Sequence, residues 1–361
     1  MDIVTHGLAS FAIARGFFPR WGKVAAFSAV LAGTVADLDW LSVYGGPATF
    51  LGGYGTSFHS IVAAVFFPIV LVCIVLGVLA TRWGGMVVPL GNAGKDETIQ
   101  VEPAARRIFL LRRFFAYALT APVCAALLHI AMDACQSNGV MLFWPFSSRR
   151  FAADWLPGID PWILVILIAC IAVPELLHLV GSEIGARAKR PHGQVGAIIG
   201  LCLALGYTGV RAVLHSNVLA ALQSRTFHGE TPRRTSAFPE TLSLLTWHGV
   251  VETESALDEI DINAASPGDF DPDASLRFFK PELSPALSAA RGTLAAWRFL
   301  AAARYPRASV EKTEAGFAVI LRDFRYAASG ETAHEVAAYI ELDSNSGVTS
   351  AGLVWARDLR Q

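Results

Sequence analysis

The stretch Gly33-Thr34-Val35-Ala36-Asp37-Leu38-Asp39-Trp40-Leu41 organises this chain, because it places two carboxylates in apolar surroundings. It ends a segment, residues 24–41, that is otherwise apolar enough to enter a lipid bilayer. A charged side chain at membrane depth costs about 2.5–3.5 kcal/mol on insertion scales and usually marks a functional site. We therefore predict that Asp37 and Asp39 take part in such a site.

The composition is that of a membrane protein. Of the 361 residues, 53% are hydrophobic and 16% are charged, against roughly 25% charged residues in soluble domains. The net charge of −1 and the absence of a basic stripe argue against a nucleic-acid-binding protein. The five cysteines lie in or beside apolar runs without CxxC spacing, which predicts buried thiols rather than disulfides or a thiolate metal site. The amino terminus lacks a basic region before its apolar stretch, so we expect it to be retained as structure.

Long apolar runs predict a bundle of about six membrane helices, the first of them short. Each longer run is near the ~20 residues that a spanning helix needs. The predicted helices cover residues 2–18, 24–43, 59–80, 108–135, 161–181 and 195–216. This pattern predicts a membrane-embedded helical domain over residues 1–222.

Near residue 223, charges, prolines and period-2 apolar patterns replace the long apolar runs. Such patterns are typical of strands and short helices in a small soluble domain. Strands are predicted at residues 242–251, 256–262, 316–324, 336–342 and 351–356, and a helix at residues 287–303. The sequence thus predicts a mainly α membrane protein with a small soluble α+β domain over residues 223–361.

Basic residues between the apolar runs predict the orientation of the chain. They lie in alternate connections, at residues 15–23, 82–113 and 187–190, so the positive-inside rule places all three in the cytoplasm. The amino terminus, the connections 44–57 and 136–160, and the C-terminal domain are then extracytoplasmic. A rise of ~1.5 Å per residue along a helix places four side chains in the outer half of the bilayer or at its outer interface: His6, Asp37, His59 and His129.

Two acid–histidine pairs have the spacing of one helical turn. His129 and Asp133 are i and i+4, so both project from one helix face. An imidazole and a carboxylate at this spacing often supply two metal ligands from one helix, although such a pair can also bridge two helices. Asp2 and His6 repeat the spacing near the amino terminus, where Asp2 is either a ligand or simply solvated.

Asp37 and Asp39 are i and i+2, which points them roughly 200° apart on a regular helix. Both reach one site only if the helix ends or distorts near Asp39; otherwise one of them orients a neighbour or faces the interface. His59, at the start of the second full span, is either a ligand or a capping residue. Together these side chains form a set of nitrogen and oxygen ligands on four helices: His6, Asp37, Asp39, His59, His129 and Asp133. Such a mix suits Zn, Mn, Fe or Mg, in a site of one or two ions.

These motifs carry a family resemblance. In chain order they are Thr5-His6, Asp37-Leu38-Asp39, Phe58-His59-Ser60, His129-x-x-x-Asp133, Asn138-Gly139 and Trp144-Pro145-Phe146. Over roughly residues 1 to 180, the set resembles the YdjM-like family of predicted membrane-bound metal-dependent hydrolases. The resemblance implies a multi-pass protein of the bacterial inner (cytoplasmic) membrane with metal-dependent hydrolase activity.

The chain departs from that family pattern in two places. Ala36 replaces the proline that precedes the two aspartates in the family, and that proline would help both carboxylates converge. Tyr54-Gly55 stands where the family has a His-Arg pair, upstream of Phe58-His59-Ser60. If the His-Arg pair binds metal or substrate in relatives, the site of this chain is reduced or altered.

Two further pairs come from spacing alone. Arg211 and His215 are i and i+4 near the outer end of the last span, where they either hold an anionic phosphate of a substrate or anchor the helix at the interface. Glu175 and His178 lie toward the cytoplasmic end of their span, so we expect them to form a structural pair.

The sequence favours a metal-dependent hydrolase that acts on an ester or phosphoester of a lipid or lipid-linked substrate at the outer leaflet. In this hypothesis a bound metal activates water, and Asp37 or Asp39 takes a proton. The alternative is a membrane protein for ion- or proton-coupled transport or for regulation, because intramembrane histidines and acids also mark such pathways. A transporter should carry polar residues on toward the cytoplasmic side, where only Glu175 and His178 are found.

Overall fold

The computed structural model describes residues 1–19, 22–82, 103–183, 193–326 and 335–360. The chain forms two compact units: Met1–Leu38 with Gly55–Val210, and Asp39–Tyr54 with Arg211–Gln361. A short segment from the N-terminal half therefore belongs with the C-terminal unit. The domain boundary between residues 222 and 223 stays a prediction. Of the predicted cytoplasmic connections, residues 83–102 and 187–190 lie outside the described residues.

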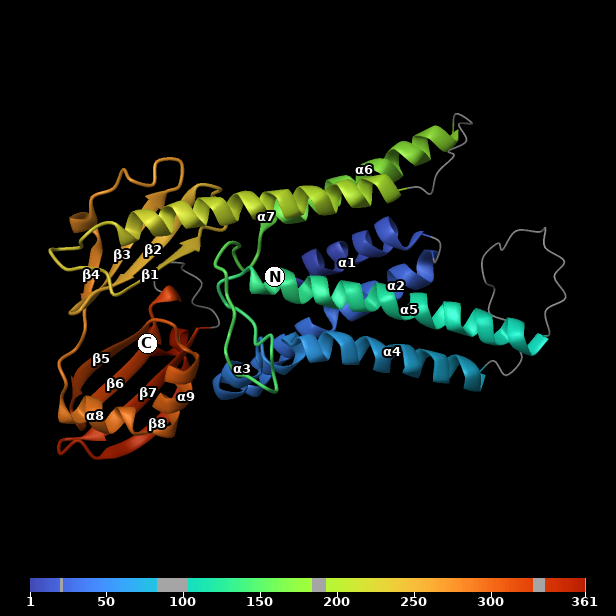
Figure 1. The fold of residues 1–361 in the computed structure, drawn as a ribbon. Helices are drawn as coiled ribbons and strands as arrows, with labels where there is room; N and C mark the ends of the chain where they lie inside the picture. Colours follow the sequence, from blue (N-terminus) through green and yellow to red (C-terminus); the bar gives the residue numbers. More distant parts are fainter. Residues whose placement is uncertain (20–21, 83–102, 184–192, 327–334, 361) are drawn as a thin grey trace. The chain divides into compact units, whose positions relative to one another are not determined.

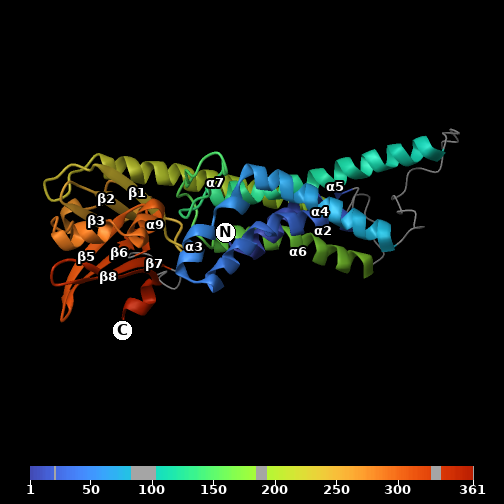
Figure 2. The same cartoon turned by 90° about the horizontal axis from the view of Figure 1, so that it is seen from below.

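The first unit is helical, and its helices lie side by side (Figures 1 and 2). Its helices are α1 (Ile3–Phe17), α2 (Gly22–Thr34), α4 (Ile61–Arg82), α5 (Pro103–Ala134), α6 (Pro161–Glu183) and the first part of α7 (Gln194–Gln223). α2 contacts α1, α4 and α5, and α1 also contacts α5 and α6. The functional residues predicted on α1 and α5 therefore come from packed neighbours.

Three helical stretches of the described residues are long and apolar enough to cross a membrane: Ala25–Gly45, Pro161–His178 and Gln194–Gln223. A bent pair of helices, Pro47–His59 and Ile61–Leu71, adds a fourth if the pair is one broken span. The apolar helices Ile3–Phe17 and Leu119–Ala134 are shorter. The helical region predicted from the sequence is present, whereas the count of six membrane helices stays a prediction.

α2 ends before the two aspartates instead of continuing through them. Its last residue is Thr34, and a 3-10 helix, η2 (Ala36–Gly45), begins two residues later. A 3-10 helix has about three residues per turn, so side chains at i and i+2 still project in different directions. Asp37 belongs to the first unit and Asp39 to the second.

The residues that follow α5 hold the segment that contains His59, which lies in a short 3-10 helix, η3 (Ser57–His59). The amide of Ile61 donates to the carbonyl of Leu142 at 3.0 Å, and the amide of Met141 donates to the carbonyl of Gly55 at 3.2 Å. Gly139 has a φ of 66°, and a Cβ at this position would lie 2.8 Å from a backbone oxygen. The Asn138-Gly139 motif thus has a structural reason, because only glycine fits this turn.

The second unit contains two antiparallel four-stranded sheets (Figure 1). The first has the order β1 (Arg234–Pro239), β2 (Thr246–Glu252), β3 (Ala256–Asn263), β4 (Leu276–Phe279). The second has the order β5 (Pro306–Thr313), β6 (Gly316–Asp323), β7 (Val336–Asp343), β8 (Val348–Trp355). The predicted strands overlap β2, β3, β6, β7 and β8. The predicted strands do not include β1, β4 and β5, each of which lies at the edge of its sheet.

The predicted helix at residues 287–303 is two helices, α8 (Pro285–Arg291) and α9 (Leu294–Ala302). The hydroxyl of Thr293 accepts the amide of Ala296 at 3.2 Å and so caps the second helix. Both helices pack against the second sheet. The large buried side chains of this core are Leu287, Phe299, Val319, Leu321 and Ile340.

The short helix α3 (Pro47–Gly53) also belongs to the second unit and packs against β7 and β8. The ring of Phe50 lies 5.6 Å from that of Trp355, measured between centroids. In the sequence, this segment lies between Asp37 and His59. The sheet of β5–β8 therefore packs against part of the segment that connects these two residues in the sequence.

Candidate metal centre

His6 lies in the first turns of a capped helix. The carboxylate of Asp2 accepts the amides of Val4 at 3.1 Å and Thr5 at 2.9 Å, which satisfies two of the free N–H groups at the start of α1. Asp2 therefore serves as a helix cap. His6 follows one turn later and is only 1% exposed.

His129 is fixed by a backbone carbonyl on α2. Its Nδ1 lies 2.7 Å from the carbonyl oxygen of Gly33, and a carbonyl can only accept, so Nδ1 carries the hydrogen. The packing of α1 against α2 requires glycine at this position, because a Cβ on residue 33 would lie 2.9 Å from the Cβ of Ser10 and overlap its Oγ. In the neutral imidazole, Nε2 of His129 is left as a bare acceptor.

Three imidazole nitrogens surround the carboxylate of Asp133, which is buried one turn beyond His129 on α5. Nε2 of His6 lies 3.2 Å from Oδ1, while Nε2 of His59 and Nε2 of His129 lie 3.0 Å and 3.2 Å from Oδ2. The ring centroids of His6 and His129 are 3.7 Å apart. The i, i+4 pair predicted on α5 thus meets histidines from two other segments.

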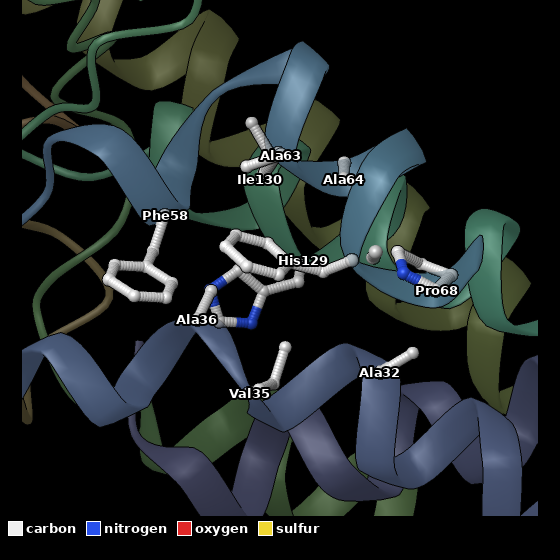
Figure 3. Close-up of a pocket in the computed structure, with 11 residues that line it drawn as sticks. Ala32, Val35, Ala36, Phe58, Ala63, Ala64, Pro68, His129 and Ile130 are labelled. Atoms are coloured by element: carbon white, nitrogen blue, oxygen red, sulfur yellow. The ribbon is translucent and has the colours of Figure 1, made fainter. Parts of the chain in front are cut away.

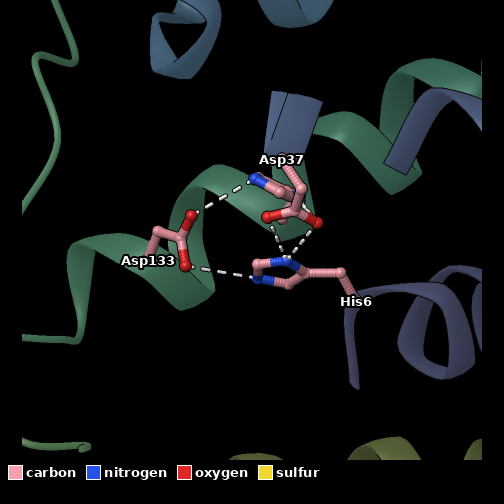
Figure 4. A group of neighbouring side chains, drawn as sticks. His6, Asp37 and Asp133 are labelled. Atoms are coloured by element: carbon pink, nitrogen blue, oxygen red, sulfur yellow. Dashed lines mark hydrogen bonds and ion pairs between the residues drawn. The ribbon is translucent and has the colours of Figure 1, made fainter. Parts of the chain in front are cut away.

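Asp37 contacts the far side of the His6 ring. Nδ1 of His6 lies 3.0 Å from Oδ2 of Asp37 and 3.2 Å from Oδ1, as Figure 4 shows. Because a carboxylate accepts, this contact places a hydrogen of His6 on Nδ1; in the neutral ring, Nε2 is then the bare nitrogen, and it faces Asp133. The side chain of Asp37 is 13% exposed, slightly more than the 9% of Asp133.

The donor set fits a divalent metal ion. Among the described residues, one ligand atom from each of His6, Asp37, His129 and Asp133 can be chosen so that all lie within 4.8 Å of one another. Nε2 of His6 and Nε2 of His129 are buried, and apart from their contacts with Asp133 they have no hydrogen-bond partner among the described residues. Two ligands on one tetrahedral ion are about 3.3 Å apart at the usual Zn–N and Zn–O distances, close to the nitrogen–oxygen distances around Asp133. Imidazole and carboxylate together suit Zn, Mn or Fe.

Three contacts of the cluster were not predicted from the sequence. Besides the Gly33 carbonyl, the Met1 amino group forms a hydrogen-bonded ion pair with Oδ1 of Asp133. The side-chain amide of Gln136 donates to the same oxygen at 2.6 Å. Gln136 stands three residues after Asp133, a spacing that could have suggested this bond.

The structure does not gather every predicted site residue in this cluster. Asp39 is 7% exposed and belongs to the second unit, so its part in the site stays a prediction. Arg211 is buried in the second unit, where it donates to the carbonyl of Leu244 at 2.8 Å and lies 4.6 Å above the ring of Trp247. His215 lies 5.3 Å from the same ring. These contacts account structurally for Arg211 and His215, and phosphate binding by this pair stays a prediction.

A narrow apolar pocket lies beside the cluster, between α2, η3, α4 and α5 (Figure 3). His129 is the only polar side chain that lines it. Many of the others are small: the lining residues are Ala32, Val35, Ala36, Phe58, Ala63, Ala64, Phe67, Pro68, Ala126, His129 and Ile130. The imidazole of His129 therefore belongs to the cluster and also lines this apolar pocket.

Comparisons with known proteins give one informative result. Neither the curated proteins nor the solved structures contain a match to this chain. A family model described as YdjM inner membrane protein matches residues 1–218, which include every histidine and aspartate of the cluster. The chain therefore belongs to the YdjM inner membrane protein family.

Proposed function

We propose that this chain is a membrane-bound metal-dependent hydrolase. The observation that carries the proposal is the group of His6, Asp37, His129 and Asp133, where two buried imidazole nitrogens lack a hydrogen-bond partner. Buried polar groups are normally satisfied, and a divalent cation would satisfy both nitrogens and the Asp133 carboxylate at once. Membership of an inner membrane protein family supports a location in the bacterial inner membrane.

The chemistry proposed is hydrolysis of an ester or phosphoester. A divalent ion bound here would lower the pKa of a bound water and polarise the bond to be cleaved. His6 and His129 keep their Nε2 atoms free of hydrogen because Asp37 and the Gly33 carbonyl hold the hydrogen on Nδ1. Asp37 is the more exposed of the two carboxylates in the cluster, so it is placed to take a proton from water.

A lipid or lipid-linked substrate fits the surroundings of the cluster. The described residues that line the pocket beside His129 are uncharged, which favours an apolar part of a substrate over a charged one at this position. Apolar side chains on the outside of α4, such as Phe66 and Val65, are exposed and compatible with lipid contact. We place the site at the outer leaflet and the C-terminal unit outside the cytoplasm. A reporter fused after Gln361 that is active only in the cytoplasm would contradict this orientation.

The contact between Arg15 and Glu175 favours hydrolysis over ion-coupled transport. The guanidinium of Arg15 forms a hydrogen-bonded ion pair with Glu175, which links this acid to α1; the structural pair of Glu175 with His178 stays a prediction. A transporter requires titratable groups that continue across the membrane. Glu175 in a guanidinium ion pair is poorly suited to carry protons or ions.

The proposal is tested with the purified full-length protein in lipid nanodiscs. Zn²⁺, Mn²⁺, Fe²⁺ or Mg²⁺ is added, and hydrolysis of a phospholipid, an acyl ester and a phosphate diester is followed. We expect metal-dependent turnover that is lost in His129→Ala and retained in His178→Ala, a histidine outside the cluster. Turnover of none of these substrates with any of the four ions, or equal turnover in both variants, would sink the proposal.

A further inference from the structure

The two aspartates of the cluster touch its histidines in different ways. The carboxylate oxygens of Asp133 lie 3.0–3.2 Å from the Nε2 atoms of three histidines. Asp37 instead faces Nδ1 of His6, at 3.0 Å and 3.2 Å from its two oxygens. One carboxylate therefore lies where three Nε2 atoms converge, and the other contacts Nδ1 of a single ring.

We propose, on the basis of the metal-dependent function above, that three imidazole nitrogens and one carboxylate bind the ion. The nitrogens are the Nε2 atoms of His6, His59 and His129, and the carboxylate is that of Asp133. Asp37 is then not a ligand: it positions the His6 ring through Nδ1, in addition to the proton-accepting role proposed above. This assignment adds His59 to the group of four and removes Asp37 from direct contact with the ion.

Hydrogen-bond chemistry supports this division of roles. Metal-binding histidines commonly donate their second ring N–H to a carboxylate or a backbone carbonyl, which fixes the ring and its tautomer. His6 has such a partner in Asp37, and His129 has one in the carbonyl of Gly33. If Asp37 bound the ion with the oxygens that contact His6, Nδ1 of His6 would lose its hydrogen-bond partner.

His59 is held rigidly enough to serve as a ligand. It is 3% exposed, and its amide donates to the carbonyl of Thr56 at 3.1 Å. The next residue, Ser60, accepts the amide of Ala63 at 3.1 Å and so fixes the start of α4. The ring centroids of His59 and His129 are 5.0 Å apart. A third imidazole is thus packed beside His129 and, like the rings of His6 and His129, turns its Nε2 toward Asp133.

Metal affinity of matched variants tests the assignment without any substrate. Full-length protein in detergent is titrated with Zn²⁺ against a chromophoric chelator, and the absorption of bound Co²⁺ reports the ligand set. Asn at position 37 keeps an oxygen that accepts from His6, so Asp37→Asn should stay within about threefold of wild type with an unchanged Co²⁺ spectrum. Asp37→Ala removes that oxygen and should weaken binding about 10–100-fold.

Loss of a true ligand should have a larger effect. We expect Asp133→Asn and His59→Gln to weaken Zn²⁺ binding more than about 100-fold and to change the Co²⁺ spectrum. Asp160→Asn is the matched control, because Asp160 is a buried aspartate outside the cluster that caps α6. Circular dichroism and gel filtration establish that each variant is folded, and His59→Asn replaces His59→Gln if the latter is not.

Two results would overturn the assignment while leaving metal binding intact. One is an Asp37→Asn variant that loses Zn²⁺ as completely as Asp133→Asn. The other is a folded His59 variant that binds like wild type. If wild-type protein binds neither Zn²⁺ nor Co²⁺, both the assignment and the proposed function fail.

Discussion

Two buried carboxylates, one in each unit, are stabilised by different kinds of partner. Asp323, at the end of β6, is 3% exposed and accepts the Arg325 guanidinium at 2.8 Å and the Arg304 amide at 2.9 Å. Burial raises the pKa of Asp323, but the Arg325 guanidinium and these hydrogen bonds outweigh it and lower the pKa below its usual value. Asp133 in the first unit is also buried; besides the Met1 amino group and the Gln136 side-chain amide, three imidazoles face it.

The difference separates a structural acid from a candidate ligand. Guanidinium and backbone N–H groups always carry hydrogen, so they satisfy Asp323 permanently. The Nε2 atoms of His6 and His129 are acceptors when the rings are neutral, so around Asp133 they leave room for a cation. Asp323 and Asp133 therefore differ in one respect: the neighbours of Asp133 include imidazole nitrogens that can lose their hydrogen, and the neighbours of Asp323 do not.

The largest effect on folding is expected at Asp323. Asp323→Ala leaves Arg325 without its buried partner and should lower the free energy of unfolding of the second unit by about 3–5 kcal/mol. Denaturant titration of the full-length protein in detergent measures this change. The exposed Asp269→Ala is the control and should shift unfolding by less than about 0.5 kcal/mol. An equally small shift for Asp323→Ala would remove the structural half of the comparison.

Metal removal should act only on the first unit. At an ion concentration 100 times the dissociation constant, binding should stabilise the folded chain by about 2.7 kcal/mol. Addition of EDTA should remove that stabilisation from wild type and from Asp323→Asn, but change nothing in Asp133→Asn. Thermal melts with and without EDTA measure the effect. The same EDTA response in Asp133→Asn would place the ion elsewhere.

Filling the pocket should separate substrate binding from metal binding. Ala63 is 6% exposed and lines the pocket, so Ala63→Phe should lower kcat/KM for a long-chain acyl ester roughly 10-fold. Turnover of a short-chain ester and the metal content should stay unchanged. Val65→Phe, on an exposed position of the same helix, is the matched control. Equal losses for long and short chains would argue against a hydrocarbon site.

The smallest expected effect concerns a histidine of the second unit. Nε2 of His248 lies 2.5 Å from Oε2 of Glu240, and Nδ1 of His248 lies 2.5 Å from Oδ1 of Asp261. Burial lowers the pKa of His248, but these carboxylates outweigh it and raise the pKa above its usual 6.5. A raised folded-state pKa stabilises the protein fully below pH 6.5, and the stabilisation is lost as pH rises through that pKa.

We therefore expect His248→Gln to lower the stability of the second unit by about 1 kcal/mol or less at pH 6 and to have no effect at pH 9. Urea unfolding at the two pH values measures the difference. A cost that grows with pH would mean that His248 is neutral in the folded protein, like the histidines assigned to the metal centre.

Much of the centre could be derived from spacing and membrane topology. The i, i+4 pair of His129 and Asp133 is local to one helix, and alternate basic loops predicted that His6 and Asp37 lie at the same depth. The position of Asp39 was not predictable in this way, because residues 39–54 pack with strands almost 300 residues later in the chain. The contact of His129 with the Gly33 carbonyl was also not predictable, because every residue has a backbone carbonyl and a sequence pattern does not show which one is used.

In the fold, too, the elements that depend on nearby residues were predictable and those that depend on distant residues were not. The apolar runs that become helices, and the alternating runs that become central strands, carry their periodicity within a few residues. β1 and β5 are edge strands, and their conformation depends on the one neighbouring strand with which each pairs. Their prediction would require knowledge of the sheet to which they belong.

The most direct test of the central claim is the metal content of the purified full-length protein. Wild-type protein, His129→Ala and His178→Ala are dialysed against the same Zn²⁺ and Mn²⁺ buffers, and bound metal is measured by mass spectrometry. We predict about one ion per chain in wild type and in His178→Ala, and less than about a tenth of that in His129→Ala. Wild-type protein without metal, or His129→Ala with the wild-type content, would contradict a metal centre at this cluster.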